Sequence, residues 1–194
     1  MDFTTRIKGR VLEYFDDEHL YLVDGVEVPS ITTMLKDNRY RWVDKEVLRK
    51  AAEAGNAVHK AIEDYCTEGK ESDLPELKGF KTIQETYGFR VLQNEVPVIL
   101  FDYDEPIAAG RVDLVLEMDG QIGGADIKRT SVLDREYLFY QLNIYRIAFF
   151  QSYGVEWEFL RGVHLRDHRH RFVQIPIDNE APMKKVYEYL EDLR

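Results

Sequence analysis

The chain has 194 residues, 44% of them hydrophobic and 32% charged, which predicts one globular domain with a substantial core. Its net charge of −10 argues against a protein that coats nucleic acid through bulk electrostatics, although an enzyme with a local basic groove remains compatible. Cys66 is the only cysteine, which excludes an internal disulfide, a four-cysteine iron–sulfur cluster and a cysteine-based zinc site. The chain has no run of about 18 apolar residues and begins without an apolar signal stretch, so we expect an intracellular protein with no membrane span.

The first part of the chain predicts a small hairpin followed by helices. Asp24-Gly25 joins two short apolar runs, which indicates a β-hairpin within residues 11–29. Ser30 is placed to cap a short helix that ends at Leu35. Apolar residues recur at helical spacing from residue 44 to about residue 67, and a second helix is expected over residues 74–87.

The second part of the chain alternates strands and helices. We expect strands over residues 89–101, 107–117 and 121–128, a helix over 135–153, strands over 155–165 and 171–175, and a closing helix over 181–193. This order predicts a single mixed α/β domain over residues 1–194, built around one central sheet.

Asp113 and Asp126 are the most informative residues. Asp119-Gly120 between two apolar-rich runs is a strong hairpin signal, because both central residues of a type I′ turn need positive φ. If these two residues form the loop, Met118 pairs with Gln121 and the register places Asp113 opposite Asp126. Directly opposed side chains have Cβ atoms about 4.5–5.5 Å apart, and like charges at that distance destabilise a sheet. We therefore expect a positive group between the two carboxylates, with a divalent cation as the first candidate.

Lys128 follows Asp126 by two residues and therefore shares its strand face. Carboxylates suit Mg²⁺ or Mn²⁺, which would polarise phosphoryl oxygens and lower the pKa of a bound water, while Lys128 orients that water or neutralises charge. Two aspartates, a divalent cation and a lysine together suit phosphodiester hydrolysis. The alternative is a solvent-facing strand with scattered charges. The predicted register and the small Gly123-Gly124, which should leave room beside the acidic face, favour the site.

Four further residues are candidates for the same site. His59 lies in the apolar stripe of the first long helix, where a buried structural histidine is the commoner case. Gly55 lies one turn earlier, and a glycine inside a helix costs about 1 kcal/mol of stability relative to Ala. Its presence there favours a close approach of another group to the helix backbone. Gln141 and Tyr145 lie one turn apart on the inward stripe of a later helix, either at its polar edge or directed toward the site or substrate. Glu95, within a strand, is a candidate additional acid near the metal.

Two stretches, residues 36–50 and 161–171, are rich in Lys and Arg. For each stretch, a solvated surface face is the preferred interpretation, and a nucleic-acid contact is the alternative.

Four motifs in chain order resemble those of the PD-(D/E)XK nucleases. They are Gly55-Asn56-Ala57-Val58-His59 with Glu63, Gly110-Arg111-Val112-Asp113, Gly124-Ala125-Asp126-Ile127-Lys128-Arg129-Thr130, and Gln141-Leu142-Asn143-Ile144-Tyr145. The similarity is greatest to RecB-type and CRISPR-adaptation exonucleases, many of them encoded by bacteriophages. It spans about residues 44–165, and the opening segment through Val28-Pro29-Ser30 also resembles phage members.

The resemblance implies a restriction-endonuclease-like core, with a central mixed sheet flanked by helices, over about residues 44–165. The N-terminal hairpin, residues 11–29, would precede this core, and a C-terminal strand and helix, residues 171–193, would follow it. Two departures from the family pattern are the absence of the four cysteines that hold an iron–sulfur cluster in several relatives and Ala54 in place of a frequent Arg.

The resemblance also implies roles for individual residues. His59, Asp113 and Asp126 would bind the metal together with the backbone carbonyl of Ile127, and Lys128 would assist the attacking water. The supporting or substrate-binding residues would be Gln141, Tyr145, Glu95 and Thr130.

We therefore expect a Mg²⁺- or Mn²⁺-dependent deoxyribonuclease, an exonuclease of DNA recombination, repair or phage replication in the cytoplasm of a bacterium or a phage-infected host. The alternatives are an endonuclease or an RNA-directed nuclease of the same superfamily and, from another class, a catalytically silent DNA-binding or assembly module. DNA is the expected partner, with a homo-oligomer or a replication or recombination protein as further candidates.

Overall fold

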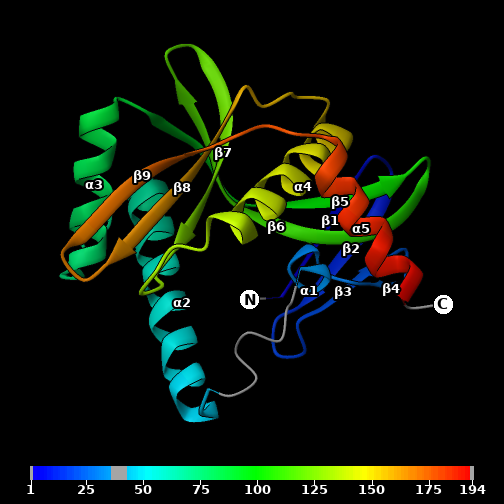
Figure 1. Ribbon diagram of the computed structural model, residues 1–194, viewed down its shortest axis with the longest axis horizontal. Helices are drawn as coiled ribbons and strands as arrows, with labels where there is room; N and C mark the ends of the chain where they lie inside the picture. Colours follow the sequence, from blue (N-terminus) through cyan, green and yellow to red (C-terminus); the bar gives the residue numbers. More distant parts are fainter. Residues whose placement is uncertain (1, 36–42, 193–194) are drawn as a thin grey trace.

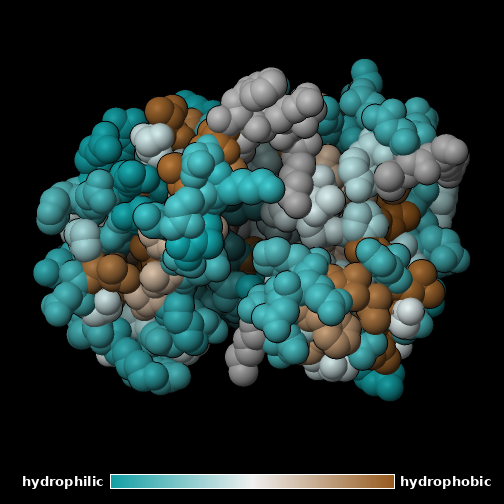
Figure 2. All heavy atoms as spheres, turned by 90° about the horizontal axis from the view of Figure 1, so that it is seen from below, coloured by the Kyte–Doolittle hydropathy of each residue, from teal (hydrophilic) through white to brown (hydrophobic). Residues whose placement is uncertain are grey.

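The computed structural model describes residues 2–35 and 43–192, which form two sheets and the helices around them (Figure 1). The N-terminal sheet has the strand order β1-β2-β3-β4, and the central sheet has the order β5-β6-β7-β8-β9. The surface seen in Figure 2 is mainly hydrophilic, with hydrophobic residues in small groups around a hollow near its middle.

The N-terminal sheet is antiparallel throughout and larger than the predicted hairpin. Its strands are β1 (Phe3–Ile7), β2 (Arg10–Phe15), β3 (Leu20–Val23) and β4 (Val26–Val28). Asp24 and Gly25 form the predicted turn, with φ of 51° and 79°. The prediction omitted β1 because its middle residues are polar, so alternation marks it only weakly.

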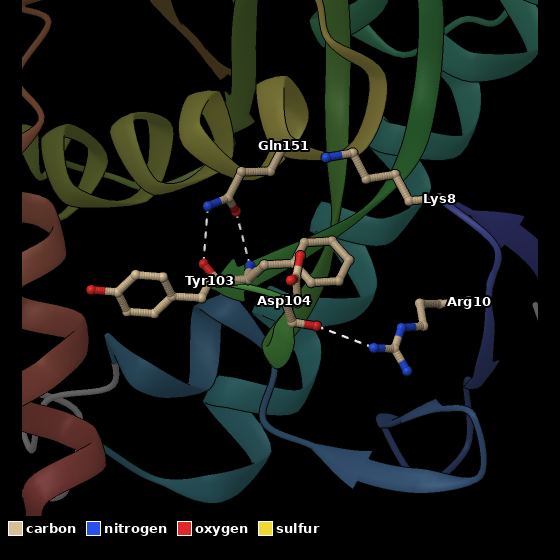
Figure 3. A pocket seen from close by; sticks show the side chains of 6 residues that line it. Lys8, Arg10, Tyr103, Asp104 and Gln151 are labelled. Atoms are coloured by element: carbon tan, nitrogen blue, oxygen red, sulfur yellow. Dashed lines mark hydrogen bonds between the residues drawn. The ribbon is translucent and has the colours of Figure 1, made fainter.

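The N-terminal sheet packs on the edge of the central sheet. Its inner residues share an apolar cluster with Ile99, Phe101 and Ala109, and the amide of Ala109 donates a 3.1 Å hydrogen bond to the carbonyl of Pro29. Between the sheets lies a cavity of about 410 Å³ (Figure 3). There Arg10 donates to the carbonyl of Asp104 at 3.1 Å, which ties the two sheets together.

The central sheet is mixed, as predicted. Its strands are β5 (Arg90–Asp102), β6 (Glu105–Met118), β7 (Gln121–Lys128), β8 (Phe159–Arg166) and β9 (Arg169–Ile175). All neighbouring strands are antiparallel except β7 and β8, which the helix α4 (Arg135–Tyr153) connects in parallel. The expected α/β fold class is confirmed.

Helices cover both faces of the central sheet. The first face carries α2 (Lys45–Glu68) and α3 (Pro75–Tyr87), whose apolar residues pack on Ile127 and Val163. The opposite face carries α4, against which the closing helix α5 (Glu180–Asp192) packs. Within residues 2–35 and 43–192, no helix combines the length and apolarity needed to cross a membrane.

The predicted start of β8 at residue 155 is wrong, and the reason involves the glycines of β7. Residues 155–158 form no strand, because Trp157 turns inward and is almost fully buried. A Cβ added to Gly124 would lie 2.0 Å from the Trp157 ring, and one added to Gly123 would lie 2.4 Å from Phe159. The expectation that these glycines leave room beside the acidic face is therefore wrong, since aromatic rings fill that space.

A buried ion pair holds the end of β7 from the far side of the sheet. Arg129, directly after Lys128, places its Nε 2.7 Å from Oε1 of Glu76 on α3. The same oxygen accepts a 3.1 Å hydrogen bond from the amide of Asp167 in the β8–β9 turn. Glu76 is 2% exposed, so one carboxylate joins a helix, a strand end and a turn in the interior.

Candidate metal centre

The β6–β7 hairpin has the predicted register. Asp119 and Gly120 form the turn, with φ of 54° and 79°, and pairing runs from Met118–Gln121 to Leu114–Ala125. The next step along both strands reaches Asp113 and Asp126. A 2.7 Å hydrogen bond from the amide of Ile127 to Oδ2 of Asp113 confirms that the two segments remain adjacent there.

Glu95 reaches the same site from the neighbouring strand β5. Its neighbours Asn94 and Val96 pair with Leu114 and Val112, so Glu95 lies beside Asp113 on the side away from β7. Its φ is 49°, an uncommon conformation for a residue other than glycine and one that costs on the order of 1–3 kcal/mol. A 2.6 Å ion pair with Arg111 Nε fixes its carboxylate, so the strain accompanies a defined position of the acid.

His59 is a cleft residue rather than a core residue, since its side chain is 30% exposed. Its Nδ1 lies 3.7 Å from Oδ2 of Asp113 and 3.6 Å from Oε1 of Glu95, and its Nε2 donates to the carbonyl of Ile127 at 3.1 Å. One nitrogen of His59 and one oxygen each of Glu95 and Asp113 lie within 4.8 Å of one another. This His–Glu–Asp group has the spacing of metal ligands, and the donor set suits a divalent cation.

Asp126 and Lys128 form the second part of the site. Asp126 is 2% exposed, and its Oδ2 forms a 2.6 Å ion pair with Lys128 Nζ. Lys128 and His59 supply positive groups beside the two aspartates. The expected cation site is borne out in part, since His59, Glu95 and Asp113 have the spacing of metal ligands. The two aspartates still lie together.

Burial and neighbouring charges shift the pKa values of these groups upward. Burial raises the pKa of Asp126 to about 6, with Lys128 opposing the rise and Asp113 adding to it. Burial also raises the pKa of Asp113, although the charge of His59 opposes it. For His59, burial alone would lower the pKa, but Asp113 and a hydrogen bond to Glu95 outweigh burial and raise it to about 9. Near neutral pH the cluster therefore retains protons that a cation would displace.

Mn²⁺ should bind more tightly as the pH rises from about 5 to about 9. Deprotonation of Asp126 through about pH 6 and of His59 through about pH 9 creates the ligands, so affinity should rise up to about tenfold per pH unit for each proton displaced. Calorimetric titration in two buffers of different ionisation enthalpy counts the released protons. An affinity that stays constant across this window would contradict the assignment of His59 and the acids as ligands.

The cluster lies in a cleft with a volume of about 360 Å³, which is lined mainly by polar side chains. Gln141 and Tyr145 from α4 are among them, as predicted. Oε1 of Gln141 is buried and has no hydrogen-bond partner among the described residues, so it can accept a hydrogen bond from a bound molecule. Tyr145 fits against Gly110, where an added Cβ would lie 2.7 Å from its ring, and burial raises its pKa.

Sequence reasoning missed the wall that the N-terminal segment contributes to this cleft. The N-terminal sheet and its β2–β3 turn supply Tyr14, His19 and Tyr21. The short helix α1 (Ile31–Met34) and its capping residue supply Thr32, Thr33 and Ser30. Tyr14 and Tyr21 are direct partners across β2 and β3, and the guanidinium of Arg111 lies 5.4 Å from the centre of the Tyr14 ring. Paired tyrosines in a short hairpin were the available signal, but periodicity alone does not show what a hairpin faces.

Some predicted features lie elsewhere. Thr130 is not among the residues that line the cleft; its carbonyl accepts a 2.7 Å hydrogen bond from His164. A Cβ added to Gly55 would meet no described atom within 4 Å, so the expected close approach is not made within the described structure.

Two of the described basic residues of the first basic stretch are paired with glutamates. Lys36, Arg39 and Arg41 lie outside the described residues. Within the described part, Arg49 pairs with two glutamates of α2, and Lys50 lies 3.4 Å from Glu46.

Replacing His59 by Ala should remove most of the Mn²⁺ affinity with little loss of stability. The side chain is partly exposed, and its hydrogen bond to the Ile127 carbonyl contributes about 1 kcal/mol. Mn²⁺ titration and thermal unfolding in EDTA measure the two effects, with His19→Ala, in the same cleft but outside the cluster, as the matched control. A large loss of stability with unchanged Mn²⁺ affinity would make His59 a structural residue.

No protein-family model and no curated protein sequence matches the chain. Among solved structures, the crystal structure of SSO0001 is similar, with a TM-score of 0.47 and 16% sequence identity over 86% of this chain and 76% of that chain. This likeness is distant.

Proposed function

We propose that the chain is a Mg²⁺- or Mn²⁺-dependent deoxyribonuclease of the PD-(D/E)XK type. One observation carries the proposal: the His59–Glu95–Asp113 group lies in the same cleft as the Asp126–Lys128 pair. A metal-binding group alone would suit many proteins. A lysine beside the second aspartate adds a charged donor aimed at the reaction site, and a purely structural metal would not need one.

His59, Asp113 and Asp126 would hold the cation, with the Ile127 carbonyl as a further ligand and Glu95 as an additional acid. The buried carboxylate of Asp126 fits this role, because it already holds one cationic group, the Lys128 ammonium at 2.6 Å from Oδ2. When bound, the cation would polarise the phosphodiester and lower the pKa of a ligated water.

The other residues act through their own contacts. Lys128 Nζ, held 2.6 Å from Asp126, can donate a hydrogen bond to the attacking water or to the charge that develops on the phosphate. Gln141 offers a buried acceptor, and Tyr145 supports the floor of the cleft. DNA is the substrate we propose, cleaved from its ends. The single cysteine agrees with a cytoplasmic setting.

Incubating the pure protein with end-labelled linear DNA and closed circular DNA tests this function. We expect digestion of linear DNA with Mg²⁺ or Mn²⁺, no digestion in EDTA, and intact circles. Asp113→Ala protein, purified in parallel, controls for contaminating nucleases. Nicked circles would instead indicate an endonuclease, cleavage of RNA alone would indicate an RNA-directed enzyme, and no cleavage with any metal would contradict a nuclease.

A further inference from the structure

A basic pocket lies on the same face of the central sheet as Lys128. It has a volume of about 280 Å³ and is lined by Arg135 at the start of α4, by Arg169 and Arg171 on β9, and by His164 on β8. No acidic side chain is among its described lining residues. In a chain with a net charge of −10, a pocket lined by three arginines and no acidic residue is unexpected.

The arginines of this pocket lack the partners that most other described arginines have. Arg90, for example, pairs with Glu117, and Arg129 pairs with Glu76. Across the described residues, no carboxylate lies within 4.0 Å of the guanidinium nitrogens of Arg135, Arg169 or Arg171. Their positive charge is therefore available to a ligand.

The strand register places the pocket in line with the catalytic lysine. Lys128 on β7 is the partner of His164 on β8, and His164 is the partner of Arg171 on β9. Side chains of paired residues share a face, and Ile127 and Phe172 pack on the opposite face, so Lys128 and Arg171 point to the same side. Two strand spacings separate them, or about 10 Å.

Arg169 is the strand partner of Arg166 across the β8–β9 hairpin. Arg166 has an acidic neighbour, with its Nε 3.5 Å from Oδ2 of Asp167, whereas Arg169 has no such partner among the described residues. A bound anion would give Arg169 the partner that it lacks. Arginine suits phosphate in particular, because its planar fork can donate two hydrogen bonds to one group.

We propose that this basic pocket binds a backbone phosphate of the DNA strand whose cleaved phosphate lies at Lys128. This inference rests on the proposed nuclease function and extends it to the path of the substrate. Phosphates of one strand recur about every 3.4 Å along B-DNA, so a separation of about 10 Å corresponds to about three nucleotides. The strand would leave the metal cluster and cross β8 toward β9.

The test measures DNA binding in EDTA, where no cleavage occurs, by fluorescence anisotropy of short labelled DNA over a range of salt concentrations. Arg169→Gln and Arg171→Gln should each weaken binding at least about tenfold at low salt. Each should lower the slope of log K against log salt by about 0.9 for duplex or about 0.7 for single-stranded DNA. Arg171→Lys should keep the slope, because it keeps the charge. Lys184→Gln on α5, outside the residues that line the pocket, is the charge-matched control.

The outcomes separate this inference from the proposed function. Arginine variants that bind DNA like Lys184→Gln would overturn the pocket, even if the protein is a nuclease. A loss seen only with 5′-phosphorylated DNA would also overturn it, since the pocket would then hold a terminal phosphate. Arginine-dependent binding without cleavage in Mg²⁺ or Mn²⁺ would support the pocket and refute the nuclease. Thermal unfolding in EDTA excludes misfolding, because removing an unpaired arginine should not lower the melting temperature.

Discussion

Replacing Lys128 by Ala should lower the rate of DNA cleavage by about 10²–10³-fold, the typical effect of removing one preorganised donor from a reaction centre. The same change should leave Mn²⁺ affinity unchanged or higher. Lys128 cannot ligate a metal, and its ammonium, 2.6 Å from Asp126, competes with a cation for that carboxylate. Single-turnover cleavage at saturating metal and Mn²⁺ titration measure the two effects separately.

Asp113→Ala and Asp126→Ala should also abolish cleavage, but through loss of the metal, so their Mn²⁺ affinity should fall. Lys184→Gln, which removes a distant surface lysine, should retain the rate of the unmodified protein. Near-normal cleavage by any of the three site variants would refute the mechanism. A loss of Mn²⁺ affinity in Lys128→Ala would mean that the lysine organises the cluster rather than the reaction.

Asp113→Asn should melt at a higher temperature than the unmodified protein in EDTA. Burial raises the pKa of Asp113, so folding favours its neutral form, and that cost applies at any pH above the raised value. An asparagine is neutral at every pH, and its Oδ1 can still accept the hydrogen bond that the Ile127 amide gives to Asp113. Differential scanning calorimetry near pH 8 should show this difference, which should shrink in acid as Asp113 becomes protonated.

Added metal should instead favour the unmodified protein over Asp113→Asn. Mn²⁺ at about a hundredfold excess over its dissociation constant should stabilise the unmodified protein by about 2.7 kcal/mol, and Asp113→Asn should respond much less. A clearly destabilised Asn variant in EDTA would show that the charge of Asp113, through its contacts with Ile127 and His59, stabilises the fold. The expectation that the opposed charges of Asp113 and Asp126 destabilise the sheet would then be wrong.

The parts of the structure that local signals encode were predicted well. Asp119-Gly120 demands a tight turn, and a two-residue turn determines which strand residues face each other, so the adjacency of Asp113 and Asp126 followed from a few neighbouring residues. Helix α4 was predicted at its observed bounds; in the structure Asp134 caps its start and Gly154, in the left-handed conformation, ends it.

Features that depend on distant segments could not be predicted in the same way. Nothing near Gly124 indicates that Trp157 fills the space above it, because the contact joins two strands that a helix separates in sequence. The meeting of Glu95 with His59 likewise depends on how α2 packs against β5. Tyr14 and Tyr21 reach the cleft only because the whole N-terminal sheet folds onto the central sheet.

The Glu76–Arg129 pair gives α3 an influence on the cleft, which α3 does not line. Arg129 follows Lys128 directly, so its anchor on the far face of the sheet limits how far the lysine can shift along or across β7. A displacement of about 1 Å at a reaction centre can cost about a hundredfold in rate. Because the same glutamate also holds the β8–β9 turn, small movements of α3 would shift Lys128 and the arginines of β9 together. The distance between the proposed cleavage site and the basic pocket would then be fixed by contacts on the opposite face of the sheet.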